Sequence, residues 1–226
     1  MATSASSERA AEPCPLAVLI SGGGSNLLAI EDACRRGQIP ARIVLVLSDK
    51  PQATGLSRAA ERGLNTLALP IESGESRSDH DDRLLRAIEA SGARFVILAG
   101  YMRILSAAFV EALAGRLLNI HPSLLPRHKG LHTHRRVLEA GEVEHGATVH
   151  FVTVDLDGGP PILQAVIPVR PDDTEASLAM RVQRCEHVIY PTVVGWLASG
   201  RLACTGGQVI LDGNRLPCAQ VQRFEV

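Results

Sequence analysis

Aromatic residues and lysine are scarce in this 226-residue sequence, and its net charge is close to zero. Aromatic residues make up 3% of the chain, so the core must be built from Val, Leu, Ile and Ala. Only Lys50 and Lys129 are lysines among the 23 basic residues, and the formal net charge is −1. This balance argues against the basic surface of a nucleic-acid-binding protein and against the polybasic surface that anionic membranes attract.

Cysteines and long apolar runs are also few. The five cysteines are odd in number and scattered, and no pair has the spacing of metal ligands (Cys14, Cys34, Cys185, Cys204, Cys218). That distribution argues against a disulfide framework and predicts a reduced, cytoplasmic protein. No apolar run approaches the roughly 20 residues of a membrane span. The N-terminal stretch has no basic region followed by an apolar segment, so no signal peptide is expected.

Length and local composition predict the domain organisation. A chain of 226 residues suits one α/β domain with a sizeable core. Small and polar residues dominate the start of the chain, which is typical of disorder. We therefore expect a disordered tail over 1–14 and a single domain over 15–226.

Short apolar runs alternate with amphipathic helical patterns through the first half of the chain. Strands are predicted at 16–20, 42–47, 65–69, 95–98 and 117–121. Helices are predicted at 27–36, 55–62, 79–90 with Asp79 as cap, and 106–114 with Ser106 as cap. The alternation predicts an α/β fold with a mostly parallel twisted sheet and flanking helices, in a right-handed Rossmann-like arrangement.

The second half changes pattern. We predict a helix at 134–140, a strand pair at 148–154 and 162–169, a helix from Thr174 to 190 with a kink at Pro191, and a hairpin around the turn Asp212-Gly213. The strand pair predicts an antiparallel addition to the sheet.

A glycine-rich turn, SGGGSN, follows the first predicted strand at 21–26. Glycines let the backbone approach a ligand, and the helix that follows presents free N–H groups, so a phosphate fits there. The dinucleotide fingerprint is incomplete because Leu27 stands at its third glycine position, and a monophosphate fits better. A tight turn with Asn26 capping the helix is the alternative. Asp49, at the end of the second strand, keeps a ribose-binding role in a dinucleotide site open.

The stretch LLNIHPSLLP starts as the fifth strand and ends as a loop at Pro122. Side chains alternate along a strand, so Asn119 and His121 share one face at the carboxyl end of a buried strand. Open α/β sheets bind their ligands at that edge. An amide donor beside an imidazole suits binding of an oxyanion and transfer of a proton. The alternative is a capping Asn and a hydrogen-bonded surface His.

Two further segments are predicted to reach the same edge. Asp157 lies in the turn DLDGGP, from which a carboxylate could reach a neighbouring strand end and stabilise an imidazolium. Taken alone, the segment is better explained by an Asx turn. The segment 102–105 follows the fourth strand directly and would wall an apolar pocket next to Asn119. Arg77 and Arg103 are each candidates to hold an anion.

Histidines are concentrated in one part of the chain. Six of the eight lie between His121 and His150, and His145 and His150 flank the predicted strand 148–154. No carboxylate or cysteine is spaced to complete a metal site, so we predict a polar cleft without a metal.

These residues together resemble the phosphoribosylglycinamide formyltransferase family, which uses 10-formyltetrahydrofolate as its one-carbon donor. ISGGGSNL, LAGYMRILS, LLNIHPSLLP, GLHTHRRVLE, HGATVHFVT and RVQRCEHVIYP carry the resemblance, which runs in order from about Leu16 to Leu216. One departure is Gly23, where bacterial relatives often carry Asn.

The resemblance implies a role for each candidate residue. It implies catalysis for Asn119, His121 and Asp157. It implies ribonucleotide binding for Gly24, Ser25, Asn26, Gln183, Arg184, Cys185 and Glu186. It implies formyl-folate binding for Arg77, Met102, Arg103, Ile104, Leu105 and Asn119.

The implied reaction transfers a formyl group to the amine of glycinamide ribonucleotide in purine biosynthesis. It needs small-molecule substrates and neither metal nor nucleic acid, in a monomer or homodimer. The alternative is formyltetrahydrofolate deformylase, a hydrolase of the same superfamily. Such hydrolases usually carry an additional N-terminal domain, and the match at Gln183 to Glu186 favours the transferase.

Overall fold

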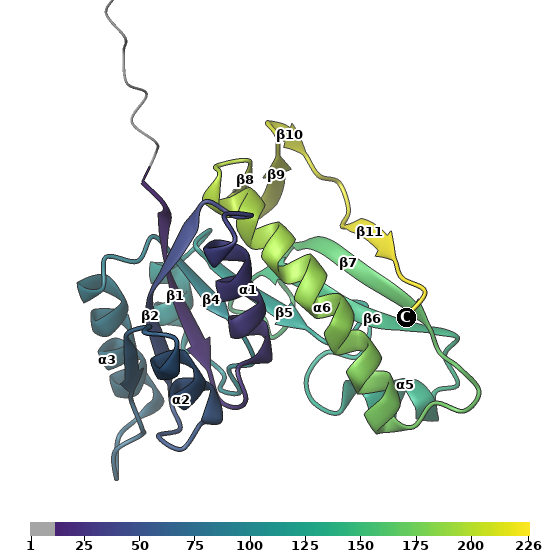
Figure 1. The fold of residues 1–226 in the computed structure, drawn as a ribbon, viewed down its shortest axis with the longest axis horizontal. Coiled ribbons are helices and arrows are strands. Elements are labelled where there is room, and N and C mark those ends of the chain that lie inside the picture. Colours follow the sequence, from purple (N-terminus) through teal and green to yellow (C-terminus); the bar gives the residue numbers. More distant parts are fainter. Residues whose placement is uncertain (1–11) are drawn as a thin grey trace, which may run out of the picture.

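The computed structural model describes residues 12–226. Most of the tail predicted over 1–14 therefore lies outside the described residues, although Cys14 already belongs to the first strand. An eight-stranded sheet with the order β11-β7-β6-β5-β4-β1-β2-β3 crosses the molecule (Figure 1). Its twist and its flanking helices confirm the predicted fold class.

The first half of the chain is the alternating, parallel part of the sheet. Its strands are β1 (Cys14–Ile20), β2 (Ala41–Ser48), β3 (Thr66–Ala68), β4 (Phe95–Leu98) and β5 (Leu117–His121). Its helices are α1 (Ser25–Arg35), α2 (Thr54–Glu61), α3 (Arg77–Ala90) and α4 (Ala107–Ala112). All the strand pairings among β1 to β5 are parallel, as the alternation predicts.

The second half adds antiparallel strands and one long helix. Its elements are α5 (Thr133–Glu139), β6 (Glu144–Phe151), β7 (Pro161–Pro168), α6 (Glu175–Ala198), β8 (Leu202–Thr205), β9 (Gln208–Leu211), β10 (Asn214–Arg215) and β11 (Gln220–Arg223). β6 pairs antiparallel with both β5 and β7, which confirms the antiparallel addition. β8, β9 and β10 form a small separate sheet around the predicted Asp212-Gly213 turn.

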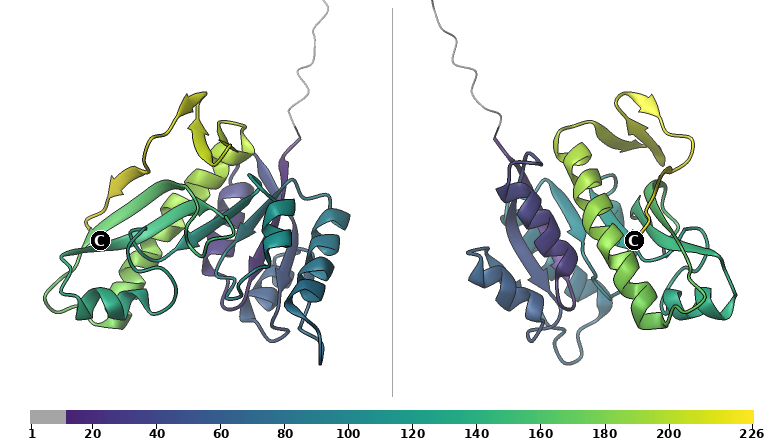
Figure 2. Two further views of the ribbon diagram at one scale, coloured as in Figure 1. Left: turned by 180° about the vertical axis from the view of Figure 1, so that it is seen from behind. Right: turned by 45° about the vertical axis from the view of Figure 1, so that its right-hand side comes forward.

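Helices cover both faces of the large sheet. On one face α1 and α6 lie side by side, with α2 beside them (Figure 2). Their buried side chains join one hydrophobic cluster, and α3 and α4 close a second cluster on the opposite face. Tyr190 of α6 is fully buried, and its hydroxyl lies within hydrogen-bond distance of the carbonyls of Leu98 and Leu118. That contact holds α6 against the last residue of β4 and the second residue of β5. No helix within residues 12–226 has the length and apolar character needed to cross a membrane.

Several predicted boundaries were wrong. α6 continues through Pro191 to Ala198, beyond the predicted end at 190. A proline inside a helix removes one hydrogen bond, but Val193, Val194 and Leu197 beyond it are buried in the core. Their packing outweighs the local disruption, because burial of each such side chain stabilises the fold by about 1.5–3 kcal/mol.

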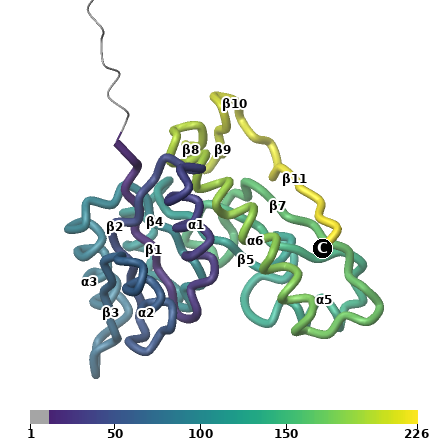
Figure 3. Tube along the Cα trace, in the orientation of Figure 1, coloured from purple at the N-terminus to yellow at the C-terminus, as the bar shows by residue number. Residues whose placement is uncertain are grey.

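Other differences concern caps and edges. Ser76, and not Asp79, caps α3, because its hydroxyl accepts the Asp79 N–H at 3.1 Å. β6 begins at Glu144 and ends at Phe151, since its first residues also pair with β7. β11 is missing from the prediction, because all its residues are exposed and give no apolar signal. Figure 3 follows this last segment along β7 to the C-terminal end.

Candidate active site

The loops after β1 and β4 are joined at the carboxyl edge of the sheet. The Ser21 hydroxyl donates to the Asp49 carboxylate at 2.6 Å and accepts the Met102 N–H at 2.9 Å. The Ser21 N–H donates to the Gly100 carbonyl at 3.1 Å. Asp49 therefore holds the glycine loop in place, and this contact accounts for its position at the end of β2.

The glycine loop leads directly into α1. Gly24 caps the helix in a left-handed conformation, with φ 69°, which glycine adopts without strain. Asn26 lies inside the helix, so the alternative role as N-cap was wrong. Gly55 of α2 packs against this loop so closely that a Cβ there would lie 2.8 Å from the Gly22 carbonyl oxygen. The first N–H groups of α1 have no acceptor within the helix and face the loop side.

A cavity of about 480 Å³ opens between the glycine loop and α6. The Asn26 amide nitrogen donates to the Glu186 carboxylate at 2.8 Å, and the Gln183 amide nitrogen donates to the Ser25 hydroxyl at 3.1 Å. Asn26 and Glu186 are both more than nine-tenths buried. Burial raises the pKa of Glu186, and the hydrogen bond from Asn26 opposes that effect. The cavity thus combines backbone donors with a partly satisfied carboxyl group.

The four residues predicted on α6 do not all reach this cavity. Gln183 and Glu186 are three positions apart, so they share one helix face, and both line it. Arg184 is exposed and does not line the cavity. Cys185 is completely buried in the core, so its side chain is turned away from any ligand there.

Asn119, His121 and Asp157 meet in a second cavity, also of about 480 Å³. Nδ1 of His121 lies 3.4 Å from a carboxylate oxygen of Asp157, and the same oxygen accepts the Gly130 N–H at 2.8 Å. Asp157 has φ 47°, a left-handed conformation within the DLDGGP turn. The turn therefore places the Asp157 carboxylate next to His121, at the end of β5. Nε2 of His121 donates to the His128 carbonyl at 3.0 Å.

His150 orients the Asn119 amide, and sequence reasoning missed it. Nδ1 of His150 donates to the Phe151 carbonyl at 2.8 Å, so its Nε2 must act as an acceptor. The Asn119 amide nitrogen donates to that Nε2 at 3.1 Å. Burial lowers the pKa of His150 and keeps the ring neutral, although the Phe151 carbonyl and Asp157 oppose this shift. The antiparallel register pairs Asn119 with His150, and this register was the signal that the sequence could not supply.

The apolar wall predicted next to Asn119 is present. Met102, Arg103 and Ile104 line the second cavity. Met102 and Ile104 are 64% and 55% exposed, so apolar surface at its mouth is open to a ligand. Leu105 lines a smaller adjoining pocket of about 100 Å³ beside Asn119, together with Leu98, Val110 and Val152.

The remaining predictions concern Arg77 and the histidines between 121 and 150. Arg77 is the exposed first residue of α3 and does not line either large cavity of the site. Most of the histidines between 121 and 150 bond to one another, to backbone carbonyls or to a carboxylate. Nδ1 of His134 and Nε2 of His145 are 2.9 Å apart, and Nε2 of His128 contacts the Glu142 carboxylate. Within residues 12–226, no group of three or more His, Cys, Asp or Glu side chains is arranged to hold a metal ion.

The two large cavities meet at the ends of β4 and β5. They share Gly100, Met102, Ile120 and Pro122 as a common wall. One side offers backbone N–H groups for an anion, and the other offers an amide, an imidazole and a carboxylate beside apolar surface. This arrangement, with two adjoining cavities that share a wall, suits an α/β group-transfer enzyme.

The chain belongs to the formyl transferase family, whose model matches residues 15–194. It is 52% identical over 202 residues to phosphoribosylglycinamide formyltransferase of Escherichia coli (strain K12), covering 89% of this chain and 95% of that one. The family predicted from the sequence motifs is therefore confirmed.

Solved structures agree with that assignment. The phosphoribosylglycinamide formyltransferase of Coxiella burnetii has a TM-score of 0.88 at 46% identity, covering 92% of this chain and all of that one. A formyltetrahydrofolate deformylase of Burkholderia mallei is more distant, with a TM-score of 0.80 at 30% identity, and covers 88% of this chain and 69% of that one.

Proposed function

We propose that this enzyme transfers the formyl group of 10-formyltetrahydrofolate to the amine of 5-phosphoribosylglycinamide. The observation that carries the proposal is the common wall between the two cavities, formed by Gly100, Met102, Ile120 and Pro122. A ribonucleotide in the first cavity would present its amine to a formyl group in the second. The relatives named phosphoribosylglycinamide formyltransferase support this choice of substrates.

The first cavity suits the ribonucleotide. The N–H groups at Gly24, Ser25 and Asn26 would bind its phosphate at the start of α1. Glu186, which lines the opposite side of the cavity, would accept hydrogen bonds from ribose hydroxyls. Such bonds would stabilise the complex, because within residues 12–226 the buried carboxyl group accepts a side-chain hydrogen bond from Asn26 alone and can accept more.

The second cavity and its small adjoining pocket suit the folate. Met102, Ile104 and Leu105 provide apolar surface on which a flat heterocycle could pack, as small-molecule sites usually do. Asn119 lines both spaces, so it would lie where the formyl group attached to the ring system enters the polar part of the site. Arg103 lines both as well, and its Nε is buried without a partner among the described residues.

Stabilisation of charge is the main chemical task. Attack of the amine on the formyl carbon produces a tetrahedral intermediate with a developing oxyanion. The second N–H of the Asn119 amide and the Nε2–H of His121 would donate to that oxygen, and each such donor is typically worth about 2.7–4 kcal/mol. The oxyanion would thereby replace the His128 carbonyl as the acceptor of the His121 N–H.

Asp157 would complete the set in two ways. Its carboxylate lies 3.4 Å from Nδ1 of His121, so it would orient the ring and stabilise positive charge that develops on it during the reaction. It also faces the cavity in which the proton must travel from the attacking amine to the departing folate nitrogen, a transfer that water would carry.

A single assay tests the proposal. The purified chain is given 10-formyltetrahydrofolate with and without glycinamide ribonucleotide, and loss of the formyl-folate is followed. We expect consumption that depends on the ribonucleotide and matches formation of the formylated product. Consumption at the same rate without the ribonucleotide would indicate the deformylase reaction instead.

The cellular setting follows from the same features. We place the reaction in the cytoplasm, since all five cysteines are free thiols. We propose a monomer or a homodimer in which each chain holds a complete site.

A further inference from the structure

We infer that the Arg58 guanidinium, which projects from α2 toward the glycine loop, binds the phosphate of the substrate. This inference rests on the proposed function and extends it, because the phosphate was so far assigned to backbone N–H groups alone. Arg58 was not singled out by any sequence motif.

The position of Arg58 is defined by a contact with the loop itself. Its Nη1 donates to the Gly23 carbonyl at 3.1 Å, and the side chain lines the first cavity with Ser25 and Asn26. A guanidinium has five N–H donors, and this bond uses one of them. The bond to Gly23 holds the guanidinium at the loop and fixes the orientation of its plane. Its remaining N–H groups are therefore positioned for bidentate binding of a phosphate.

Close packing keeps α2 in that position. Gly55, the second residue of α2, packs against the loop, and its N–H donates to the Gly22 carbonyl at 3.0 Å. A Cβ at Gly55 would lie 2.5 Å from Cδ1 of Ile20, so a larger residue would push the helix outward. Arg58 lies one turn further along the same short helix, and the approach of Gly55 therefore brings its guanidinium to the loop.

Charge balance requires a cation there. A phosphomonoester carries about −1.5 to −2 at neutral pH, and the start of a helix offers the equivalent of only about +0.5. Among the residues that line the first cavity, Arg58 is the one cation and Glu186 the one acid. The two therefore also set the direction of the ligand, with its phosphate toward α2 and its hydroxyls toward α6.

A second, independent observation in the same cavity points to a polar ligand. Asn26 is more than nine-tenths buried and lines the cavity, and its carbonyl oxygen has no hydrogen-bond partner within the described residues. Buried polar atoms are nearly always paired, so the cavity is built to receive a polar molecule with donors as well as a phosphate.

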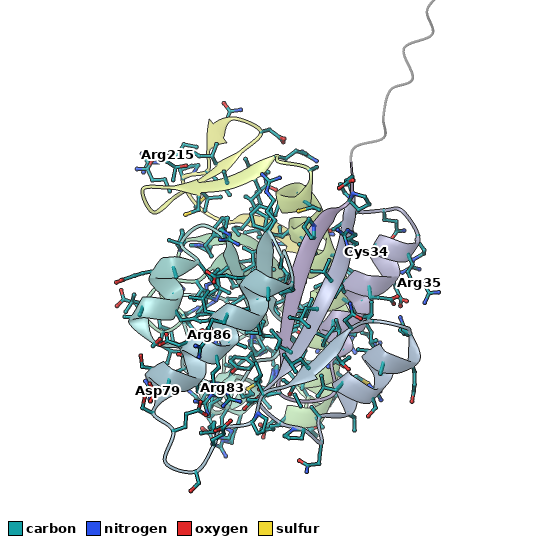
Figure 4. The ribbon with its side chains drawn as sticks, turned by 90° about the vertical axis from the view of Figure 1, so that its left-hand side faces the viewer. Cys34, Arg35, Asp79, Arg83, Arg86 and Arg215 are labelled. Atoms are coloured by element: carbon teal, nitrogen blue, oxygen red, sulfur yellow. The ribbon has the colours of Figure 1, made fainter. Side chains whose placement is uncertain are left out.

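The test compares Arg58→Gln and Arg58→Lys with the control Arg86→Gln. Arg86 lies exposed on α3 and lines neither cavity (Figure 4), so its substitution removes the same charge away from the site. Each variant is assayed with glycinamide ribonucleotide and with the corresponding ribonucleoside, which lacks the phosphate.

We expect Arg58→Gln to lower kcat/KM for the ribonucleotide by ~10-fold to ~100-fold, through KM, as for loss of a charge-assisted hydrogen bond. The ribonucleoside should change by less than about twofold, as should both substrates with Arg86→Gln. Arg58→Lys should fall between, because it keeps the charge and loses the planar fork. An equal loss for ribonucleotide and ribonucleoside would overturn the inference, since Arg58 would then act by shaping the loop.

A binding measurement separates this inference from the proposed function. Ribose 5-phosphate is titrated calorimetrically into the unmodified chain and into Arg58→Gln. Binding weakened ~10-fold or more by Arg58→Gln supports the inference even if the chain transfers no formyl group to the ribonucleotide. Equal affinity in the two proteins overturns the inference even if the transfer reaction is found.

Discussion

Replacing Asp157 with Asn isolates the charge of the carboxylate from its structural contacts. Asp157 has φ 47°, and Asn adopts that left-handed conformation at least as readily as Asp. The Asn side-chain oxygen can still accept the Gly130 N–H that Asp157 accepts at 2.8 Å. Asp157→Ala would lose that bond and place a residue without a polar side chain in the left-handed region, at a further cost of about 1–2 kcal/mol.

The geometry sets the size of the effect. The Asp157 carboxylate lies 3.4 Å from Nδ1 of His121, so its charge acts on the ring that would donate to the oxyanion. Both side chains are more than nine-tenths buried, and loss of one donor to an oxyanion typically raises the barrier by about 2.7–4 kcal/mol. Because the pair faces an open cavity, we take the lower figure, which corresponds to a ~100-fold loss of kcat.

Steady-state kinetics with both substrates tests this prediction. Since the imidazolium acts on the oxyanion, kcat and kcat/KM should fall together while KM for each substrate stays near its original value. Thermal unfolding of the variant serves as the control, and its midpoint should remain unchanged. A correctly folded Asp157→Asn enzyme with kcat within about twofold of the unmodified chain would refute the role given to this carboxylate.

Three further predictions concern neighbouring groups. His150→Phe removes the acceptor of the Asn119 amide, so kcat should fall ~10-fold at nearly constant KM; an unchanged kcat would show that Asn119 needs no such support. Burial raises the pKa of Glu186 above 4.5, so KM for the ribonucleotide should rise as the pH falls toward that raised pKa. Glu186→Gln should raise KM at pH 7 and remove this dependence of KM on pH. Burial lowers the pKa of His145 from 6.5 to about 3, so between these values the unfolded chain binds more protons and the free energy of unfolding should increase with pH. His145→Gln should reduce that slope in urea titrations, and an identical slope would contradict the assignment.

Strands with continuous apolar runs were predictable from the sequence. β4 and β5 have the predicted bounds, because parallel strands buried on both faces show their ends as abrupt losses of apolar character. β11 was not predictable, since it is exposed along its length and joins the sheet only through backbone bonds to β7. The end of α6 was misplaced for the opposite reason, as buried residues after Pro191 keep the helix intact.

The candidate site was predictable where its residues are neighbours in the sequence. Strand alternation alone placed Asn119 and His121 on one face, and the structure brings both into one cavity. Asp157 became a partner of His121 only through the turn between β6 and β7, which lies more than 30 residues further along the chain. Helical periodicity could have separated Gln183 and Glu186 from Cys185, since the first two share a face and the third is buried against the core.

The sequence by itself determined the alternation of strands and helices, the glycine loop at the start of α1 and the family of the enzyme. These features depend on local periodicity and short motifs, which each segment carries without its neighbours. Tertiary structure alone decided that His150 supports Asn119 and that Arg58 reaches the Gly23 carbonyl. Those contacts depend on strand register and on the close approach of α2, and such long-range geometry is set by packing across the whole sheet.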